Sequence, residues 1–316
     1  MAPAMARSAP PETYSADRPA QASPEPLVRP KVAYVMGAGR SGSTILGITL
    51  GNCDGVIYAG EMDKWLRCSG DPPLGGEERE RFWREVRERV DVDPELTGKV
   101  ARCLEASSAP FRARFWGKQR HLRGPYRRFA GELYRTIAQV GHARQIVDTS
   151  HFPRRARELQ HVEGIDLYLL FLVRDPQSIV ASWDRDDVVE PRFTPLQTNA
   201  YMWLTYLISL FVFLRHPRKR RLLVRHEDFV ANPEGVVRDI LDRMESSAPL
   251  PDFEELRTGV AFQGNRVARE QVVSLNGSAP RPPRFSLLTA VLQLPWKLVF
   301  SLLGPVAGAS ARRQAR

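Results

Sequence analysis

A run of three glycines, one arginine and three hydroxyl side chains spans residues 37–44, with the sequence GAGRSGST. Glycines let backbone N–H groups approach an anion closely, and the positive end of a helix dipole favours the same negative charge. A guanidinium group can bind two oxygens of one phosphate or sulfate. The stretch therefore predicts a cradle for a tetrahedral anion. Its contacts are expected from six consecutive residues: Gly39, Arg40, Ser41, Gly42, Ser43 and Thr44.

The segments on either side of this loop suit that role. Residues 32–36 form an apolar run typical of a buried strand, and residues 45–50 continue as an apolar stretch that suits a buried helix. The glycine and threonine spacing is that of a P-loop, but Ser43 stands where a nucleotide triphosphatase has its lysine. The missing lysine argues against hydrolysis of ATP or GTP, whereas Arg40 keeps a cation in the loop.

An acidic residue follows the next strand-like run. Residues 55–58 are predicted as a strand, and Glu61 comes directly after the glycine that follows it. A carboxylate at this place can face the bound anion and accept the proton of a hydroxyl group that attacks it. The alternative is a solvated loop acid, or an acid favoured at a helix start by the dipole.

A second anion contact is predicted after residues 167–173, the most strand-like run of the chain. Arg174 follows this run directly, and Ser182 lies on the helix that should begin near Pro176. A strand-end arginine and a helix serine can hold a second phosphate group together. The alternative is a capped helix with a surface arginine.

Residues 145–147 read as another strand, and polar residues from Asp148 to His151 follow it. Histidine titrates near neutral pH. His151 is therefore a second candidate base, a contact for an acceptor molecule, or simply a residue that caps the next helix.

Together these motifs resemble the sulfotransferases that use 3′-phosphoadenosine 5′-phosphosulfate (PAPS). The resemblance covers roughly residues 31–275. The first loop resembles the family's 5′-phosphosulfate loop, and the spacing RDPxxxxxS from Arg174 to Ser182 resembles its 3′-phosphate signature. In several branches of the family a Gly-Glu pair at the position of Glu61 carries the catalytic base. Arg269 fits the arginine of a late basic loop that closes over the nucleotide.

Two positions depart from the family pattern. His151 stands where the family often has a lysine, so a permanent cation is replaced by a titratable group. Arg266 stands where a proline usually follows Gly-Asn, so the match to the late basic loop is loose.

The resemblance implies an α/β fold with a mainly parallel sheet flanked by helices, similar to P-loop kinases. It implies transfer of a sulfuryl group from PAPS to a hydroxyl acceptor without a metal. Glu61 would accept the proton, and Arg40 would stabilise the developing charge. A small molecule, a glycan or a lipid could each supply the hydroxyl group.

Two other functions stay open at this point. One is a small-molecule kinase with an altered P-loop, in which Asp148 or Asp175 would hold magnesium. The other is a non-catalytic protein that keeps the loop as a nucleotide-docking site. The absent loop lysine argues against the first, and Glu61 argues against the second.

Composition sets the remaining expectations. The 316 residues are 43% apolar and carry a net charge of +10, which fits an anionic ligand, nucleic acid or a membrane surface. The sequence contains no recognisable motif of a nucleic-acid-binding domain, and its charged residues are scattered between apolar segments. We therefore expect no nucleic-acid partner. Three cysteines without CxxC spacing imply neither a disulfide framework nor a zinc site, and the cytoplasm is the expected location.

Three segments are predicted along the chain. Residues 1–30 are rich in Pro, Ala and Ser and read as a disordered tail. Residues 31–279 form the sulfotransferase domain, in which residues 203–214 are expected as a core helix. Residues 280–316 combine an apolar run with basic residues, and we expect them either to dock on the core or to contact a membrane peripherally.

Overall fold

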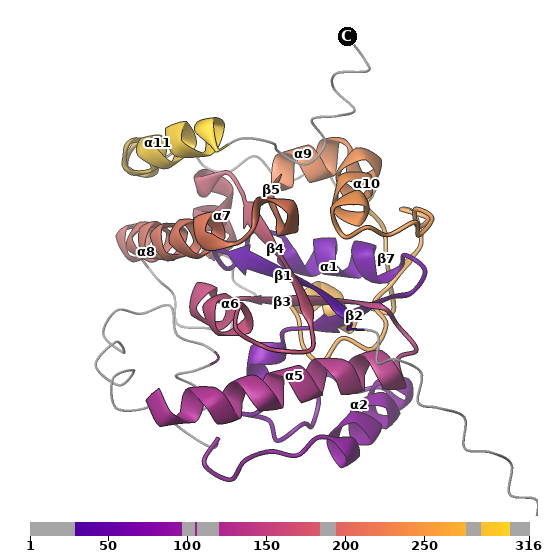
Figure 1. Cartoon of the computed structure of the whole chain (residues 1–316). Helices are drawn as coiled ribbons and strands as arrows, with labels where there is room; N and C mark the ends of the chain where they lie inside the picture. Colours follow the sequence, from indigo (N-terminus) through magenta and orange to yellow (C-terminus); the bar gives the residue numbers. More distant parts are fainter. Residues whose placement is uncertain (1–28, 97–104, 106–119, 184–193, 276–285, 304–316) are drawn as a thin grey trace, which may run out of the picture.

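A five-stranded sheet forms the centre of this computed structural model, which describes residues 29–96, 105, 120–183, 194–275 and 286–303 (Figure 1). The strand order is β2-β3-β1-β4-β5, and every neighbouring pair is parallel. The predicted mainly parallel α/β sheet is therefore confirmed, with helices on both faces. The five strands are β1 (Lys31–Gly37), β2 (Val56–Gly60), β3 (Gln145–His151), β4 (Asp166–Val173) and β5 (Arg221–Arg225).

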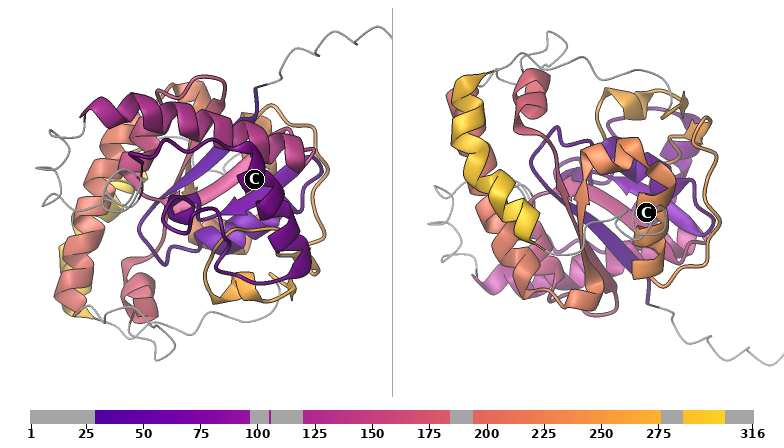
Figure 2. Two further views of the ribbon diagram at one scale, coloured as in Figure 1. Left: turned by 90° about the horizontal axis from the view of Figure 1, so that it is seen from below. Right: turned by 90° about the horizontal axis from the view of Figure 1, so that it is seen from above.

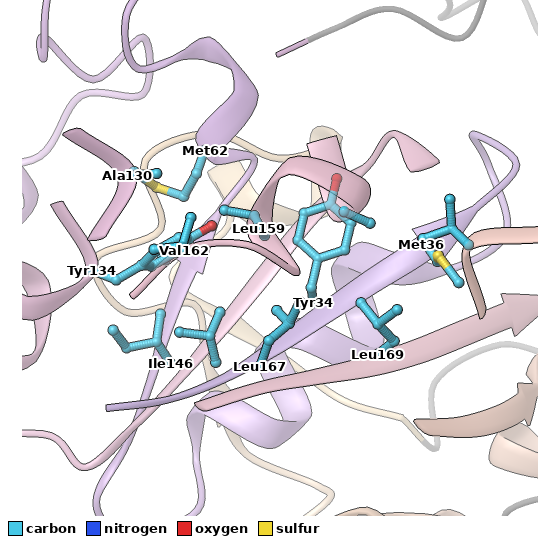
Figure 3. Packing of buried hydrophobic residues seen from close by; sticks show 14 of the residues in the cluster. Tyr34, Met36, Met62, Ala130, Tyr134, Ile146, Leu159, Val162, Leu167 and Leu169 are labelled. Carbon is cyan, nitrogen blue, oxygen red and sulfur yellow. The ribbon is translucent and has the colours of Figure 1, made fainter. Parts of the chain in front are cut away.

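Each face of the sheet has its own hydrophobic core, because successive side chains of a strand point to opposite faces. Along β1, Tyr34 and Met36 pack on one face, whereas Ala33 and Val35 pack on the other. Figure 3 shows the first core, where Tyr34 lies among side chains of neighbouring strands and helices. Central parallel strands that are buried on both faces tend to be apolar, and β4 is buried without a charged side chain from Leu167 to Val173.

The helices divide between these two cores (Figures 1 and 2). The face with Ala33 is covered by α1 (Ser43–Gly51), α9 (His226–Ala231) and α10 (Pro233–Arg243). The face with Tyr34 is covered by α5 (Arg123–Val140), α6 (Pro153–Leu159) and α8 (Pro195–Arg215). The helix α2 (Glu77–Arg89) packs against α5, while α7 (Pro176–Trp183) and α11 (Leu287–Leu302) pack against α8. Two short strands, β6 (Leu256–Arg257) and β7 (Val272–Val273), form a separate antiparallel pair.

The expected core helix over residues 203–214 lies within a longer helix, α8, and one side of this helix belongs to the core. Its inner side, which includes Met202 and Tyr206, is buried, but Leu207 and Phe211 are exposed. The sequence looks uniformly apolar because α8 has apolar residues on both its buried and its exposed sides.

The C-terminal helix α11 lies against α8. Trp203 Nε1 of α8 donates to the Leu292 carbonyl at 2.7 Å, and Gln293 Nε2 donates to Asn199 Oδ1 of α8 at 2.8 Å. The predicted boundary at residues 279 and 280 stays a prediction, and the predicted tail of residues 1–30 lies almost entirely outside the described residues. Among the helices that the structure describes, none has the length and apolar character needed to cross a bilayer.

A fully buried arginine organises the core beneath the ends of β2 and β3. Arg155 donates to Asp148 Oδ2 at 3.4 Å, to Glu105 Oε1 at 3.3 Å and to two tyrosine hydroxyls. Asp148 also accepts from Tyr134 and from both the N–H and the hydroxyl of Ser150. Burial raises the pKa of Glu105, and the positive charge of Arg155 opposes that rise.

Replacing Arg155 should destabilise the protein strongly. Arg155→Met leaves Asp148 and Glu105 buried without their cation, and removal of one partner from a buried ion pair costs about 3–5 kcal/mol. Arg157→Met, on the exposed side of the same helix α6, is the matched control and should change the free energy of unfolding by less than about 0.5 kcal/mol. Urea unfolding measures both. Equal stability of the two variants would contradict the role given to Arg155.

Candidate anion-binding and catalytic site

The sheet brings the predicted site residues to one edge, because the carboxyl ends of parallel strands lie together. The loop of residues 38–42 follows β1, and Glu61 follows β2. His151 ends β3, and Arg174 follows β4. His226, which begins α9 directly after β5, reaches the same edge.

Two glycines of the loop are required by close packing. Gly37 has φ 150°, and a Cβ there would lie 2.2 Å from the Leu172 carbonyl oxygen of β4. Gly42 precedes α1 with φ 96°, and a Cβ there would lie 2.4 Å from His226 Nδ1. Backbone of this kind strongly favours glycine. The loop is therefore held between β4 and the start of α9 while its amides lead into the N-terminus of α1.

Arg40 combines a strained backbone with an unsatisfied donor. Its φ is 68°, a conformation that costs a non-glycine residue about 1–2 kcal/mol. Arg40 Nη1 donates to Asn265 Oδ1 at 3.3 Å, and the guanidinium lies 5.8 Å from the centre of the Trp183 ring. Its Nε is buried, and no acceptor for it exists in the described part of the chain. A buried donor of this kind fits an anionic ligand, which would supply the missing acceptor.

Arg174 reaches the loop from the end of β4. Arg174 Nη1 donates to the carbonyl oxygen of Arg40 at 3.1 Å, so the two predicted anion-binding arginines are brought together. Burial lowers the pKa of Arg174 from its ordinary value, although arginine stays charged at neutral pH. Ser182 lies partly buried at the end of α7, and its predicted part in the phosphate contact stays a prediction.

The carboxylate of Glu61 is held in place rather than solvated. Glu61 is mostly buried, and its Oε2 accepts from Lys64 Nζ at 2.5 Å. Its side chain makes no capping bond to the short helix η1 (Met62–Lys64) that follows it. The burial does not fit a solvated loop acid, whereas the position of Glu61 directly before η1 keeps the helix-start alternative open. A buried carboxylate that keeps one charged partner is suited to accept a proton.

Residues 261–265 connect the end of β2 to the anion loop. The Phe262 N–H donates to the Ala59 carbonyl, and the Glu61 N–H donates to the Gln263 carbonyl, both at 2.8 Å. The Asn265 N–H donates to Thr44 Oγ1 at 3.4 Å, while the Asn265 side chain accepts from Arg40. This segment thus fixes Glu61 and Arg40 relative to each other.

Arg269 lies farther along, in the short helix η5 (Arg266–Arg269), and is exposed. Asn265, and not Arg269, makes the contact with Arg40 that the structure shows. The closing role of Arg269 over a nucleotide stays a prediction.

His151 occupies a strained turn at the end of β3. Its φ is 55°, and the Phe152 N–H donates to the Ser150 carbonyl at 2.7 Å across it. The imidazole lies 4.2 Å from the Phe152 ring, measured between centroids. Left-handed backbone at a non-glycine residue is a feature that often accompanies function. Its roles as base or acceptor contact stay predictions.

The two aspartates considered as magnesium ligands already have other partners. Asp148 is buried and accepts hydrogen bonds from Arg155, Tyr134 and Ser150, as described above. Asp175 accepts from the Ser178 N–H at 3.0 Å and forms an ion pair with Lys297 at 3.7 Å. Asp148 therefore stabilises the core by pairing with Arg155, and Asp175 caps the N-terminus of α7.

Three contacts of the loop were not predicted from the sequence. The hydroxyl of Tyr201 accepts from the Gly39 N–H at 3.1 Å, Trp183 lies beside Arg40, and His226 packs on Gly42. Tyr201 and Trp183 come from helices that carry no motif at these positions. His226 had one available signal, since it lies just after the apolar run of residues 222–224, which is typical of a strand.

The family model that matches the chain and three solved structures that resemble it all describe sulfotransferases. Residues 33–249 match the family model described as the sulfotransferase family. No curated protein sequence matches the chain.

Solved structures that are similar include three sulfotransferases. The sulfotransferase domain from the curacin biosynthetic pathway shares 16% identity over 85% of this chain and 98% of its own, with a TM-score of 0.49. The sulfotransferase domain of the Synechococcus PCC 7002 olefin synthase shares 17% identity over 88% and 97%, with a TM-score of 0.49. STF1 from Mycobacterium tuberculosis H37Rv shares 14% identity over 70% and 69%, with a TM-score of 0.45.

The packing of His226 on the loop predicts a pH dependence of stability. Burial first, and then the charge of Arg174, lowers the pKa of His226 from 6.5 to about 4. The unfolded chain therefore binds a proton at this group more readily between these pH values. Stability should fall as the pH falls from 6.5 toward 4, by at most about 1.4 kcal/mol per pH unit through this group.

His226→Gln should flatten this part of the stability profile relative to the wild type. His161→Gln removes an exposed histidine and serves as the control, because all other titrating groups are common to the three proteins. Urea unfolding across the pH range measures the slopes. If His226→Gln and His161→Gln give the same slope, His226 is not buried in its neutral form.

Proposed function

Because the chain belongs to the sulfotransferase family, we propose that it transfers a sulfuryl group from PAPS to a hydroxyl acceptor. The observation that carries the proposal is the pairing of Arg40 and Arg174 at the carboxyl ends of β1 and β4. Arg40 has a buried Nε without an acceptor among the described residues, and its backbone is strained. Two cations beside a glycine loop and a helix N-terminus suit a ligand with two separate anionic groups.

The proposed step is an in-line displacement at sulfur. The acceptor oxygen attacks the sulfur, and its proton passes to the carboxylate of Glu61. The bond between the sulfur and the bridging phosphate oxygen breaks, and adenosine 3′,5′-bisphosphate leaves. Arg40 and the loop N–H groups stabilise the negative charge that grows on that oxygen. Lys64 holds the Glu61 carboxylate in position.

The donor would be held at both ends. The loop from Gly39 to Thr44 takes the 5′-phosphosulfate, and Arg174 with Ser182 takes the 3′-phosphate. Arg269 would close over the nucleotide. No metal takes part in this scheme, and the engagement of Asp148 and Asp175 elsewhere weakens the kinase hypothesis.

The same proposal includes His151 as the alternative base or as a contact for the acceptor. The acceptor is a hydroxyl group on a small molecule, a glycan or a lipid. The proposal keeps residues 31–279 as the catalytic domain and a cytoplasmic location.

Arg174→Ala should weaken the binding of a ligand that carries a 3′-phosphate far more than the binding of one that lacks it. Loss of a partly buried cation from a charged contact should reduce the affinity for adenosine 3′,5′-bisphosphate by roughly thirtyfold or more. The affinity for adenosine 5′-monophosphate should fall much less, because that ligand loses only the support that Arg174 gives to the loop through the Arg40 carbonyl. Arg238→Ala, on an exposed position of α10, is the control. Titration calorimetry measures both nucleotides with the wild type and the two variants, and an equal loss for both nucleotides in Arg174→Ala would refute the assignment of Arg174 to the 3′-phosphate.

Glu61→Gln should abolish most turnover while leaving donor binding intact, because glutamine keeps the acceptor for Lys64 but cannot take a proton. A rate loss of about 100-fold to 10,000-fold is expected for a missing general base. The measurement is release of adenosine 3′,5′-bisphosphate from PAPS in the presence of mixed phenols and sugar alcohols. Glu88→Gln, an exposed position on α2, is the control. If His151→Asn shows the loss and Glu61→Gln does not, His151 is the base.

A further inference from the structure

The helix α11 turns a stripe of large apolar side chains away from the rest of the protein. The stripe, here called the α11 stripe, has spacings of three and four residues, which place its members on one helix face. All its members are more than half exposed: Leu287, Val291, Leu294, Leu298 and Leu302. The opposite side of the helix, with Trp296 and Phe300, is buried against α8. The α11 stripe therefore faces outward while the helix is fixed to the protein.

Exposed apolar residues on α8 extend this surface. Figures 1 and 2 show α8 and α11 side by side along one side of the molecule, and the two helices are in contact. Leu207, Phe211 and Leu214 of α8 are exposed, and Trp203 is partly exposed beside α11. A large exposed apolar surface on a soluble domain usually marks contact with a protein or a membrane.

The charge of the sequence that contains α11 favours an anionic partner. Residues 271–316 contain no acidic residue and six basic ones: Arg281, Arg284, Lys297, Arg312, Arg313 and Arg316. Lys297 is the one of these within the described residues, where it is half exposed and pairs with Asp175 at 3.7 Å. At the end of α8, Arg215, Arg218 and Lys219 are exposed next to the apolar residues of that helix. Apolar side chains flanked by Lys and Arg, without acidic residues, are characteristic of helices that lie in the interface of an anionic membrane.

We propose that the α11 stripe docks the protein onto an anionic lipid surface, with the helix lying along the membrane. The 16 residues of α11 extend about 24 Å, which is less than the hydrocarbon thickness of about 30 Å. Its inner side is tied to α8 by Gln293 and Trp296, so the outer side alone is available to lipid. This inference concerns where the protein works and is independent of the group that it transfers.

A second copy of the chain is the main competing occupant of this surface. The acid-free, basic C-terminal part speaks against it, because two copies would bring like charges together. A segment of the chain itself is a weaker competitor. Residues 304–316, which follow Leu303 at the end of α11, contain one large apolar side chain, that of Val306, against five in the α11 stripe.

Vesicle flotation tests the proposal with the full chain. The wild type should float with vesicles of phosphatidylcholine and phosphatidylglycerol in equal parts, much less with pure phosphatidylcholine, and less as sodium chloride is added. Leu294→Glu should weaken binding to the mixed vesicles by about tenfold or more, because a charge replaces a side chain that would leave water. Val272→Glu adds the same charge at an exposed apolar residue of β7, away from α8 and α11 in Figure 1, and should bind like the wild type.

A second variant and a folding control distinguish loss of membrane binding from loss of the fold. Leu298→Gln adds no charge and should also weaken vesicle binding, and thermal unfolding shows whether each variant is folded. Wild-type protein that stays unbound with the mixed vesicles, or Leu294→Glu that binds as well as the wild type, would overturn the proposal. A dimer in light scattering that Leu294→Glu dissociates, without vesicle binding, would assign the surface to a second copy.

Discussion

The hydrogen bond from Arg174 to the carbonyl oxygen of Arg40 joins the two halves of the site. It is available only because β1 and β4 are neighbours in a parallel sheet, which places the residues after both strands at one edge. The same neighbour relation makes Gly37 necessary, since its missing Cβ makes room for the Leu172 carbonyl of β4. The pairing of β1 with β4 therefore determines both the conformation of the loop and the relative positions of Arg40 and Arg174.

Contacts from three other parts of the chain hold this edge of the sheet in place. Residues 261–265 cross from β2 to the loop and connect Glu61 to Arg40 through backbone and Asn265 contacts. On the other side, Tyr201 accepts from the Gly39 N–H. Beneath the site, Arg155 neutralises Asp148 and Glu105 in the core. Strain at Arg40 and at His151 is confined to the rim, where the surrounding packing fixes the backbone.

Much of this arrangement was predictable because it follows from local pattern. Apolar runs, including that of residues 222–224, indicated the five strands, and the residues after the first four runs indicated the loop, Glu61, His151 and Arg174. What could not be predicted comes from tertiary packing. Nothing near Tyr201 in sequence indicates that it lies at the loop, and Trp183 had no signal except its place next to Ser182. Asn265 became visible as a loop contact only through the crossing of residues 261–265. The apolar run in α8 was predicted as a core helix, but composition does not show that only one side of the helix is buried and that Leu207 and Phe211 remain exposed.

The most direct test is titration calorimetry of the wild-type protein with two ligands. One titration uses adenosine 3′,5′-bisphosphate with a metal chelator present, and the other uses ATP with magnesium. A PAPS-dependent sulfotransferase should bind the bisphosphate without metal and at least about tenfold more tightly than ATP with magnesium, because its second cation contacts a 3′-phosphate that ATP lacks. Tight binding of ATP with magnesium and none of the bisphosphate would contradict the proposed function and favour a kinase.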